Sequence, residues 1–198
     1  MSELLGDDGL DYEDMVNLAA GHDAALNRIM ERYGEFVHRF IFRSLGNVDD
    51  ALDLTQETFV RVYKQRNRYR PERKFRSWLL TITSNLVRDR IRWRIRHPTS
   101  PIAALEDSAE PNGDLASASR QDEPDGTAIR SEEAAIVREA ITGLTEDLRI
   151  PLVLFHYEGH SYSEISELLE CSSKAVEMRI YRAKKQLLTV LEPQLKKN

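Results

Sequence analysis

The chain has 198 residues, of which 41% are hydrophobic and 31% are charged, and its formal net charge is -5, which fits one or two small domains with adequate cores. The longest apolar run, residues 150–155, is too short to cross a bilayer, and the acidic N-terminus lacks both the basic start and the apolar run of a secretory signal. These features predict a cytoplasmic protein without membrane insertion.

Two helical patterns open the chain. The first runs from Tyr12 to Ala20, and Asp23 is predicted to cap a longer helix that extends to about Leu45. The longer helix carries a wide apolar stripe, which is typical of a core helix in a bundle. The stripe consists of Leu26, Ile29, Met30, Tyr33, Val37, Phe40 and Ile41.

A third helix follows Gly46-Asn47 and is predicted to be capped by Asp49 or Asp50. Its buried face is expected to consist of Ala51, Leu54, Phe59 and Val62. Asp50, Asp53 and Glu57 lie off this face at helical spacing, so the sequence predicts an acidic ridge at the surface. The ridge suits a basic partner, although the helix dipole also favours acids at a helix start.

The chain then becomes strongly basic. Residues 61–96 carry 13 basic and 2 acidic side chains, whereas residues 1–60 carry 4 basic and 13 acidic ones. Within this basic block, residues 67–74 contain a proline and no helical stripe, so a loop is predicted there, followed by a fourth helix from Phe75 to about Arg96. Local charge of this density indicates a nucleic-acid partner despite the acidic average.

Aromatic side chains are interleaved with these cations, a combination that holds single-stranded nucleic acid by backbone charge and base stacking. The aromatic residues are Tyr63, Tyr69, Phe75, Trp78 and Trp93. Trp78 lies beside the inward position Leu79 and is expected in the core, so Tyr69 is the better candidate for stacking. Asn85 can pair with an adenine edge or can be an ordinary surface residue, and both readings stay open.

The segment 97–130 differs in kind from its neighbours. It holds 4 of the 7 prolines, several serines and no aromatic residue, with 7 acidic against 2 basic side chains. This composition predicts a flexible acidic linker. Helical pattern resumes at Ser131, and Thr145 is predicted to cap a helix that covers the following segment from behind through Leu148, Leu152 and Phe155.

Residues 161–187 have the outline of a helix-turn-helix. Ser161 and Glu164 are spaced as a capping box, and Ser172 is a second N-cap. The turn carries Glu170 where a glycine is usual, which implies a left-handed backbone at a cost of about 1 kcal/mol. In the second helix, a narrow apolar stripe is formed by Val176, Ile180, Ala183 and Leu187.

The opposite face of that second helix is basic and partly aromatic. It presents Lys174, Met178, Tyr181, Arg182 and Lys185. Such a face suits the major groove of DNA, where cations contact phosphates and the first turns reach base edges. An ordinary solvated helix has the same pattern, so this stretch alone leaves the two interpretations equally supported.

No catalytic or metal centre is indicated. The single cysteine, Cys171, cannot form an internal disulfide and is expected to be a small core residue. His156 and His160 have the spacing of a metalloprotease pair, but Gly159 interrupts the helix between them and the glutamate is displaced. With neither a nucleophile nor a phosphate-binding glycine loop, the sequence predicts a protein that is not an enzyme and needs no cofactor and no metal.

Four motifs in order carry a family resemblance. They are DALDLTQETFVRVY, FRSWLLTITSNLVRDRIR, RIPLVLFHYEGHSYSEISELL and AVEMRIYRAKKQL. Together they resemble bacterial RNA polymerase sigma factors of the extracytoplasmic-function class. The resemblance implies an all-α fold with two small helical domains: region 2 at residues 1–96, the flexible acidic linker at 97–130, and region 4 at 131–198. Leu52, Glu170 and Met178 depart from the family pattern.

The resemblance also implies three sets of site residues. Core RNA polymerase would be bound by Asp50, Asp53, Gln56 and Glu57. The downstream promoter element would be bound by Arg68, Tyr69, Arg70, Lys74, Arg76, Asn85, Arg88 and Arg92. The upstream promoter element would be bound by Ser173, Lys174, Glu177, Met178, Arg179, Tyr181, Arg182 and Lys185.

The implied function is to direct RNA polymerase to promoters. The partners are the beta and beta-prime subunits of the polymerase core and promoter DNA, and the resemblance allows an anti-sigma factor as a further partner. The alternative is a stand-alone helix-turn-helix repressor whose N-terminal bundle dimerises or binds a ligand. The repressor would bind duplex DNA tightly without polymerase.

Overall fold

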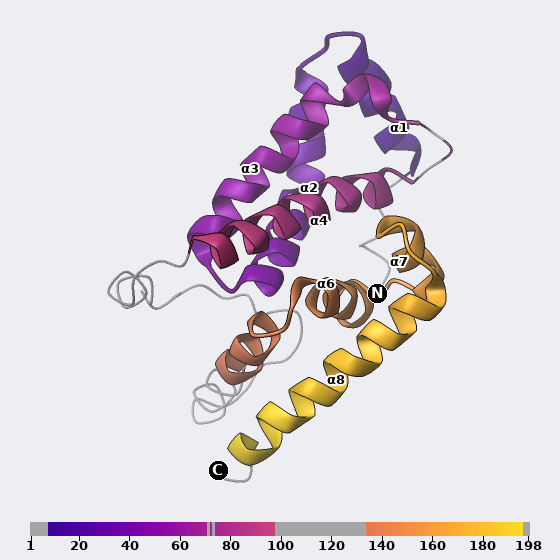
Figure 1. Cartoon of the computed structure of the whole chain (residues 1–198). Helices are drawn as coiled ribbons and strands as arrows, with labels where there is room; N and C mark the ends of the chain where they lie inside the picture. Colours follow the sequence, from indigo (N-terminus) through magenta and orange to yellow (C-terminus); the bar gives the residue numbers. More distant parts are fainter. Residues whose placement is uncertain (1–7, 71, 73, 98–133, 196–198) are drawn as a thin grey trace, which may run out of the picture.

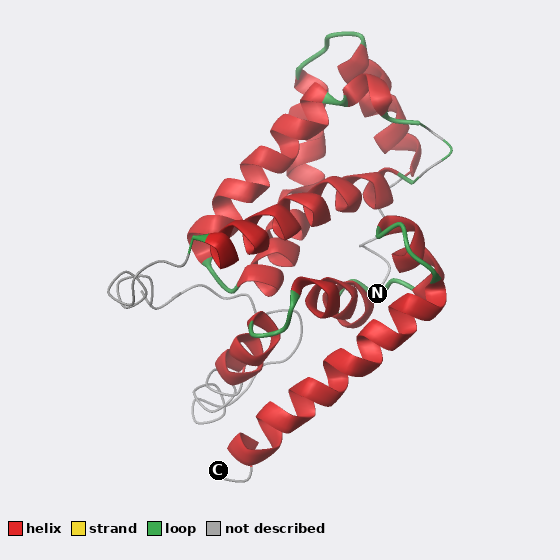
Figure 2. Ribbon diagram, in the orientation of Figure 1, coloured by secondary structure: helices red, strands yellow, loops and turns green. Residues whose placement is uncertain are grey.

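The computed structural model describes residues 8–70, 72, 74–97 and 134–195, and within these ranges every regular element is a helix (Figures 1 and 2). The helices form two groups, one before and one after residues 98–133 (Figure 1). The predicted all-α, two-domain fold is therefore confirmed. The predicted linker lies outside the described residues except for His97.

The N-terminal group contains four α-helices and a short 3-10 turn. They are α1 (Asp8–Ala19), α2 (Ala24–Leu45), α3 (Val48–Lys64), η1 (Arg66–Arg68) and α4 (Phe75–Arg96). The predicted stripe of α2 is buried or packed against the core except for Met30, which lies at the edge of the stripe and is 40% exposed. The predicted inward face of α3 is buried throughout.

Helix caps were predicted less well than helix faces. Asp23 has helical backbone angles and makes no capping hydrogen bond, and the Thr145 side chain makes none either. The cap of α3 is Asn47, whose side-chain oxygen accepts a hydrogen bond from the backbone N–H of Asp50 at 2.8 Å. The predicted cap at Asp49 or Asp50 is thus wrong, because the preceding asparagine already satisfies the orphan amide.

Ion pairs fasten α1 to α2. Asp11 and Asp14 are buried, and Arg32 reaches both of them, with Nε at 2.9 Å from an Asp11 oxygen and Nη2 at 2.6 Å from an Asp14 oxygen. The Tyr33 hydroxyl donates to the other Asp11 oxygen. The pKa of Asp11 is raised, chiefly by burial and with a smaller contribution from Asp8, although Tyr33 and Arg32 lower it.

The C-terminal group contains the helix at residues 134–142, α6 (Glu146–His156), α7 (Tyr162–Leu168) and α8 (Ser173–Leu195). Both halves of the predicted capping box are present: the Ser161 N–H donates to Glu164 at 2.8 Å and the Glu164 N–H donates back to the Ser161 hydroxyl at 3.3 Å. Glu170 has the predicted left-handed backbone, with φ +52. The predicted helix-turn-helix is confirmed in these local details.

Helix α6 packs behind the helix-turn-helix, as predicted, and contacts both α7 and α8 (Figure 1). Leu148 and Leu152 are buried in this contact, and the Phe155 ring lies 5.0 Å from the Tyr162 ring between centroids. Pro151 lies inside α6, beyond its first turn. The exposed start of α8 is thus supported from behind by a continuous apolar core.

The two groups also contact each other, since α6 lies against α2 and α4 while α7 lies against α4 (Figure 1). Gly46, which ends α2 with φ +69, faces Thr142 of the C-terminal group. A Cβ atom at Gly46 would lie 2.8 Å from the Thr142 methyl carbon, so a glycine is required there both for its backbone and for this close approach.

We predict that Glu164→Ala lowers the free energy of unfolding at about pH 7 by about 0.3 to 1 kcal/mol, because a first-turn carboxylate is lost. The backbone N–H of Ser161 lowers the pKa of Glu164, so this stabilisation is present above its unfolded pKa and lost as the pH falls through its folded pKa. Urea unfolding at about pH 7 and about pH 3 tests this, with Glu167→Ala on the same helix as control. An undiminished cost at acid pH would contradict the assignment.

Candidate nucleic-acid interface

The start of α8 presents the basic face that the sequence predicts. Val176, Ile180 and Ala183 are fully buried, and they hold the helix against the rest of the domain. The predicted contact residues that are exposed are Ser173, Lys174, Glu177, Met178, Tyr181, Arg182 and Lys185. Tyr181 is 62% exposed and Met178 39%, so both side chains are accessible to a ligand.

Two cations of α8 are engaged within the protein. Lys174 Nζ lies 2.8 Å from a Glu177 oxygen, one helical turn away. Arg179 is half-buried and turns toward the body of the domain, with Nη1 donating to Cys171 Sγ at 3.7 Å and Nη2 lying 3.9 Å from Asp147. The outward positive charge of this face that is not paired within the protein is therefore carried mainly by Arg182 and Lys185, farther along the helix.

A second exposed face lies on α4. Arg88 lies three residues after Asn85, and Arg92 lies four residues after Arg88. At this spacing all three share one side of the helix. Asn85 is exposed, and its side-chain oxygen accepts a weak hydrogen bond from Arg88 at 3.4 Å. In the preceding loop, Arg68, Arg70 and Lys74 are also exposed. On α4, two cations thus share a side of the helix with one polar side chain that can read a base edge.

Tyr69, predicted as the stacking residue, belongs to an aromatic cluster at the base of this loop. Its ring lies 5.4 Å from Trp78 and 5.7 Å from Phe75 between centroids. The sequence predicts Trp78 in the core and Tyr69 available for stacking. Both residues are half-buried, so their burial does not distinguish the two roles. Burial raises the pKa of the Tyr69 hydroxyl, with a further contribution from Asp11.

Arg76 differs from the other predicted contacts of the downstream element. Its guanidinium lies 4.3 Å from the centre of the Phe36 ring, on the side of α4 that faces α2, and Nη2 lies 3.7 Å from a Glu158 oxygen. The side chain is only 23% exposed. The sequence predicted an outward DNA contact here, and in this arrangement Arg76 is instead half-buried between the two domains.

Arg92 also contacts the C-terminal domain. Its guanidinium donates to Glu146 at 2.8 Å, and this bond raises the already high pKa of Arg92. Unlike Arg76, the Arg92 side chain is 58% exposed. It therefore stays on the outward face of α4 while bonded to the start of α6.

The predicted acidic ridge on α3 is smaller than expected. Asp53 and Gln56 are exposed, and Glu57 lies 3.0 Å from Arg61 on the next turn. Asp50 is only 7% exposed and is held by Arg90 and Arg94 of α4, with Arg94 Nη2 at 2.5 Å. The prediction that Asp50 belongs to the exposed ridge is wrong, because this carboxylate is buried and pairs with two arginines of α4.

Leu52 and Val60 were not singled out as site residues, yet they are 50% and 42% exposed beside Asp53 and Gln56 on α3. Leu52, Gln56 and Val60 are four residues apart and share a face.

Among the described residues, no group of three or more His, Cys, Asp and Glu side chains could hold a metal ion. Likewise, none of the helices in the described ranges has the length and hydropathy of a membrane span.

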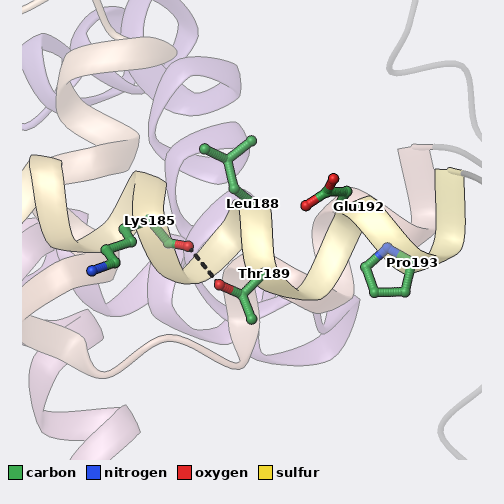
Figure 3. A pocket seen from close by; sticks show the side chains of 5 residues that line it. All are labelled: Lys185, Leu188, Thr189, Glu192 and Pro193. Atoms are coloured by element: carbon green, nitrogen blue, oxygen red, sulfur yellow. Dashed lines mark hydrogen bonds between the residues drawn. The ribbon is translucent and has the colours of Figure 1, made fainter.

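The hollow shown in Figure 3 is lined by five residues of one helix, α8. They are Lys185, Leu188, Thr189, Glu192 and Pro193. Because they follow one another at helical spacing along one side of α8, they form a shallow surface and not an enclosed binding site. The Thr189 hydroxyl donates to the Lys185 carbonyl of the same helix (Figure 3).

Each of the two domains matches a known protein family. Residues 29–96 match the family described as Sigma-70 region 2, and residues 134–187 match the family described as Sigma-70, region 4. The two matches fall on the N-terminal bundle with its α4 face and on the helix-turn-helix domain, in that order.

Individual proteins resemble the chain over nearly its whole length. It is 28% identical to the RNA polymerase sigma-H factor of Pseudomonas aeruginosa, over 94% of this chain and 96% of that one. It is 29% identical to the ECF RNA polymerase sigma-E factor of Haemophilus influenzae, over 98% and 99%. A solved structure of CnrH in complex with the cytosolic domain of CnrY aligns with a TM-score of 0.65 and 28% identity, over 93% of this chain and 98% of that one.

We predict that Asp50→Ala lowers the free energy of unfolding by about 1 to 3 kcal/mol, because it leaves two arginines without their carboxylate partner. Asp53→Ala, on the exposed side of the same helix, should change it by less than about 0.5 kcal/mol. Urea unfolding of both variants measures the difference. Equal effects of the two substitutions would show that the Asp50 ion pairs do not stabilise the bundle.

Proposed function

The chain belongs to the sigma-70 family, in its extracytoplasmic-function class, and directs RNA polymerase to promoters; on this premise we propose how its parts divide that work. Residues 1–96 act as region 2, which binds core polymerase and opens the downstream promoter element. Residues 97–130 link the domains, and residues 131–198 act as region 4, which reads the upstream element. The supporting observation is that one chain carries both regions in order, each with an exposed face of cations and polar side chains.

The polymerase-binding surface in this proposal is the outward side of α3. Asp53, Gln56 and Glu57 supply its acidic and polar part, and Leu52 and Val60 supply an exposed apolar part. Asp50 acts from beneath by anchoring α3 to α4. An acidic and apolar helix face of this kind complements a basic helix on the beta-prime subunit of the polymerase.

The downstream element is bound as a single strand by the loop and the outward side of α4. Arg68, Arg70 and Lys74 contact the backbone, and Tyr69 at the loop base offers a ring for stacking. On α4, Asn85 pairs with an adenine edge, and Arg88 and Arg92 follow it on the same side of the helix. The upstream element is bound as a duplex by the first turns of α8.

The protein acts by binding, without a reaction of its own, and it does so in the cytoplasm, where it meets polymerase and promoter DNA. A partner protein of the anti-sigma class is also part of this proposal. Its support is the resemblance to CnrH, which was solved in complex with the cytosolic domain of CnrY. A stand-alone repressor is not favoured, because its function does not require a domain that matches Sigma-70 region 2.

We predict that reversing Asp53 and Glu57 to Lys weakens binding to core polymerase by about 2 to 5 kcal/mol if their charge pairs are buried in the complex. A matched control reverses Glu13 and Glu31, which are exposed on α1 and α2 of the same domain. Binding of labelled protein to core polymerase measures the effect, and circular dichroism checks that helix content is unchanged. Wild-type affinity of the Asp53 and Glu57 variant, with its fold intact, would refute this surface.

For α8, we predict that Lys174→Ala changes which upstream sequences are used, whereas Arg182→Ala weakens all of them alike. Lys174 lies in the first turn, where side chains reach base edges, and Arg182 lies farther along, where it contacts phosphate. Arg182→Ala should also reduce the slope of log affinity against log salt concentration by about 1, the change expected for the loss of one phosphate contact. Transcription from a panel of upstream-element variants provides the measurement. Identical sequence profiles for the two variants would contradict the division of roles.

A further inference from the structure

His160 is a buried histidine in the segment that joins α6 to α7. It is 9% exposed, and its backbone N–H donates to the Leu154 carbonyl at 3.1 Å. The helix that follows, α7, lies against α4 of the N-terminal domain (Figure 1). His160 therefore lies beside the contact between the two domains, with little access to water.

The ring nitrogens of His160 have few partners. Nε2 is buried and has no hydrogen-bond partner among the described residues. Nδ1 lies 3.9 Å from a Glu164 oxygen, which already accepts hydrogen bonds at 2.8 Å from both the Ser161 N–H and the Ser161 hydroxyl. Protonation turns both ring nitrogens into N–H donors and adds a charge. A buried site that satisfies neither the donor nor the charge therefore favours the neutral imidazole.

The imidazole faces a cation of the N-terminal domain. Burial is the main cause that lowers the pKa of His160, and Arg76 of α4 lowers it further, whereas Glu164 of α7 raises it by less. Lys74, just before α4, acts in turn on Glu164. A protonated His160 is thus a second cation beside Arg76, with one already bonded carboxylate to balance the two.

Glu158, two residues before His160, is the other buried titratable group in this contact. One of its oxygens lies 3.0 Å from Arg43 Nη1 and the other lies 3.7 Å from Arg76 Nη2. Arg39 of α2 also acts on this carboxylate. Glu158 is therefore engaged by cations of the N-terminal domain.

Acid acts on His160 and Glu158 in opposite directions. Separation of the domains removes Arg76 from His160, so the separated form binds the proton more readily and the contact weakens as the pH falls below about 6.5. The pKa of Glu158 is raised in the contact, chiefly by burial, so protonation of this carboxyl favours the contact at lower pH. The contact is accordingly weakest in mild acid, between the two titrations.

We propose that His160 makes the contact between the domains sensitive to mild acid, because a protonated imidazole places a second cation beside Arg76 and loosens α7 from α4. The response needs neither polymerase nor DNA. Uptake of one proton changes the equilibrium between joined and separated domains by at most about tenfold per pH unit. The 36 residues from 98 to 133 have a contour length of roughly 120 Å, so the covalent connection allows the domains to separate.

The test follows the distance between the domains in the full chain. Dyes are attached at Glu31→Cys on α2 and Glu167→Cys on α7, both exposed positions, and Cys171→Ser removes the natural thiol. Energy transfer between the dyes is measured from about pH 7.5 to about pH 5.5, the range in which an ordinary histidine titrates. The labelled chain is compared with its His160→Gln variant and with a matched control, His22→Gln, which changes an exposed histidine. Circular dichroism confirms that helix content is constant over this range.

Energy transfer should fall with pH in the labelled chain and in the His22→Gln control, with the separation constant rising by up to about tenfold per pH unit. The His160→Gln variant cannot take up this proton and should lose most of the fall, while the opposite effect of Glu158 remains. Arg76→Gln provides a second check. Without the facing cation, His160 holds its proton more readily within the contact, so the response should shrink.

An NMR titration of the histidine rings in the wild-type chain gives a measurement that needs no variant to fold. His160 should titrate at a lower pH than the exposed His22. Titration of the two rings at the same pH would overturn the proposal. So would constant energy transfer in the labelled chain, or a response that His160→Gln leaves unchanged.

Discussion

One buried guanidinium joins the inner structure of the C-terminal domain to its contact with the N-terminal bundle. Arg149 is 8% exposed and reaches three backbone carbonyls: Thr142 and Leu144, which precede α6, and Ser44 at the end of α2. Burial lowers its pKa to about 10, and no carboxylate is among these partners. The orphan carbonyls at a helix C-terminus favour a cation, and the last turn of α2 accepts this bond from Arg149. A single side chain thus connects the fold of the C-terminal domain to its contact with the N-terminal bundle.

The charge pattern of the basic block, residues 61–96, predicts exposed cations but does not show which of them pair with acids of the protein itself. Its density indicates a nucleic-acid partner, and exposed cations do lie along the loop and α4. Yet Arg90 and Arg94 neutralise Asp50 inside the bundle, and Arg76 and Arg92 meet acids of the other domain. Part of the positive charge therefore stabilises the protein itself. The surface available to a ligand depends on which of these internal pairs are broken.

Local signals predicted most of the fold. The apolar stripes of α2 and α3, the capping box at Ser161 and the left-handed Glu170 all follow from residues within a few positions of one another. The failures have two causes. Adjacent capping residues compete, so Asn47 took the place predicted for Asp49 or Asp50. Pairs distant in sequence, such as Asp50 with Arg90 and Glu158 with Arg76, leave no local pattern, and they decide which candidate site residues face solvent.

The most direct test of the account is to map the 5′ ends of transcripts made in vitro by core polymerase on fragmented genomic DNA, with and without this protein. The account predicts that the protein creates discrete start sites that core polymerase alone does not use, and that these sites share a pair of upstream sequence elements at constant spacing. Tight binding of the protein to duplex DNA without polymerase, together with no new start sites, would contradict it and would favour a repressor.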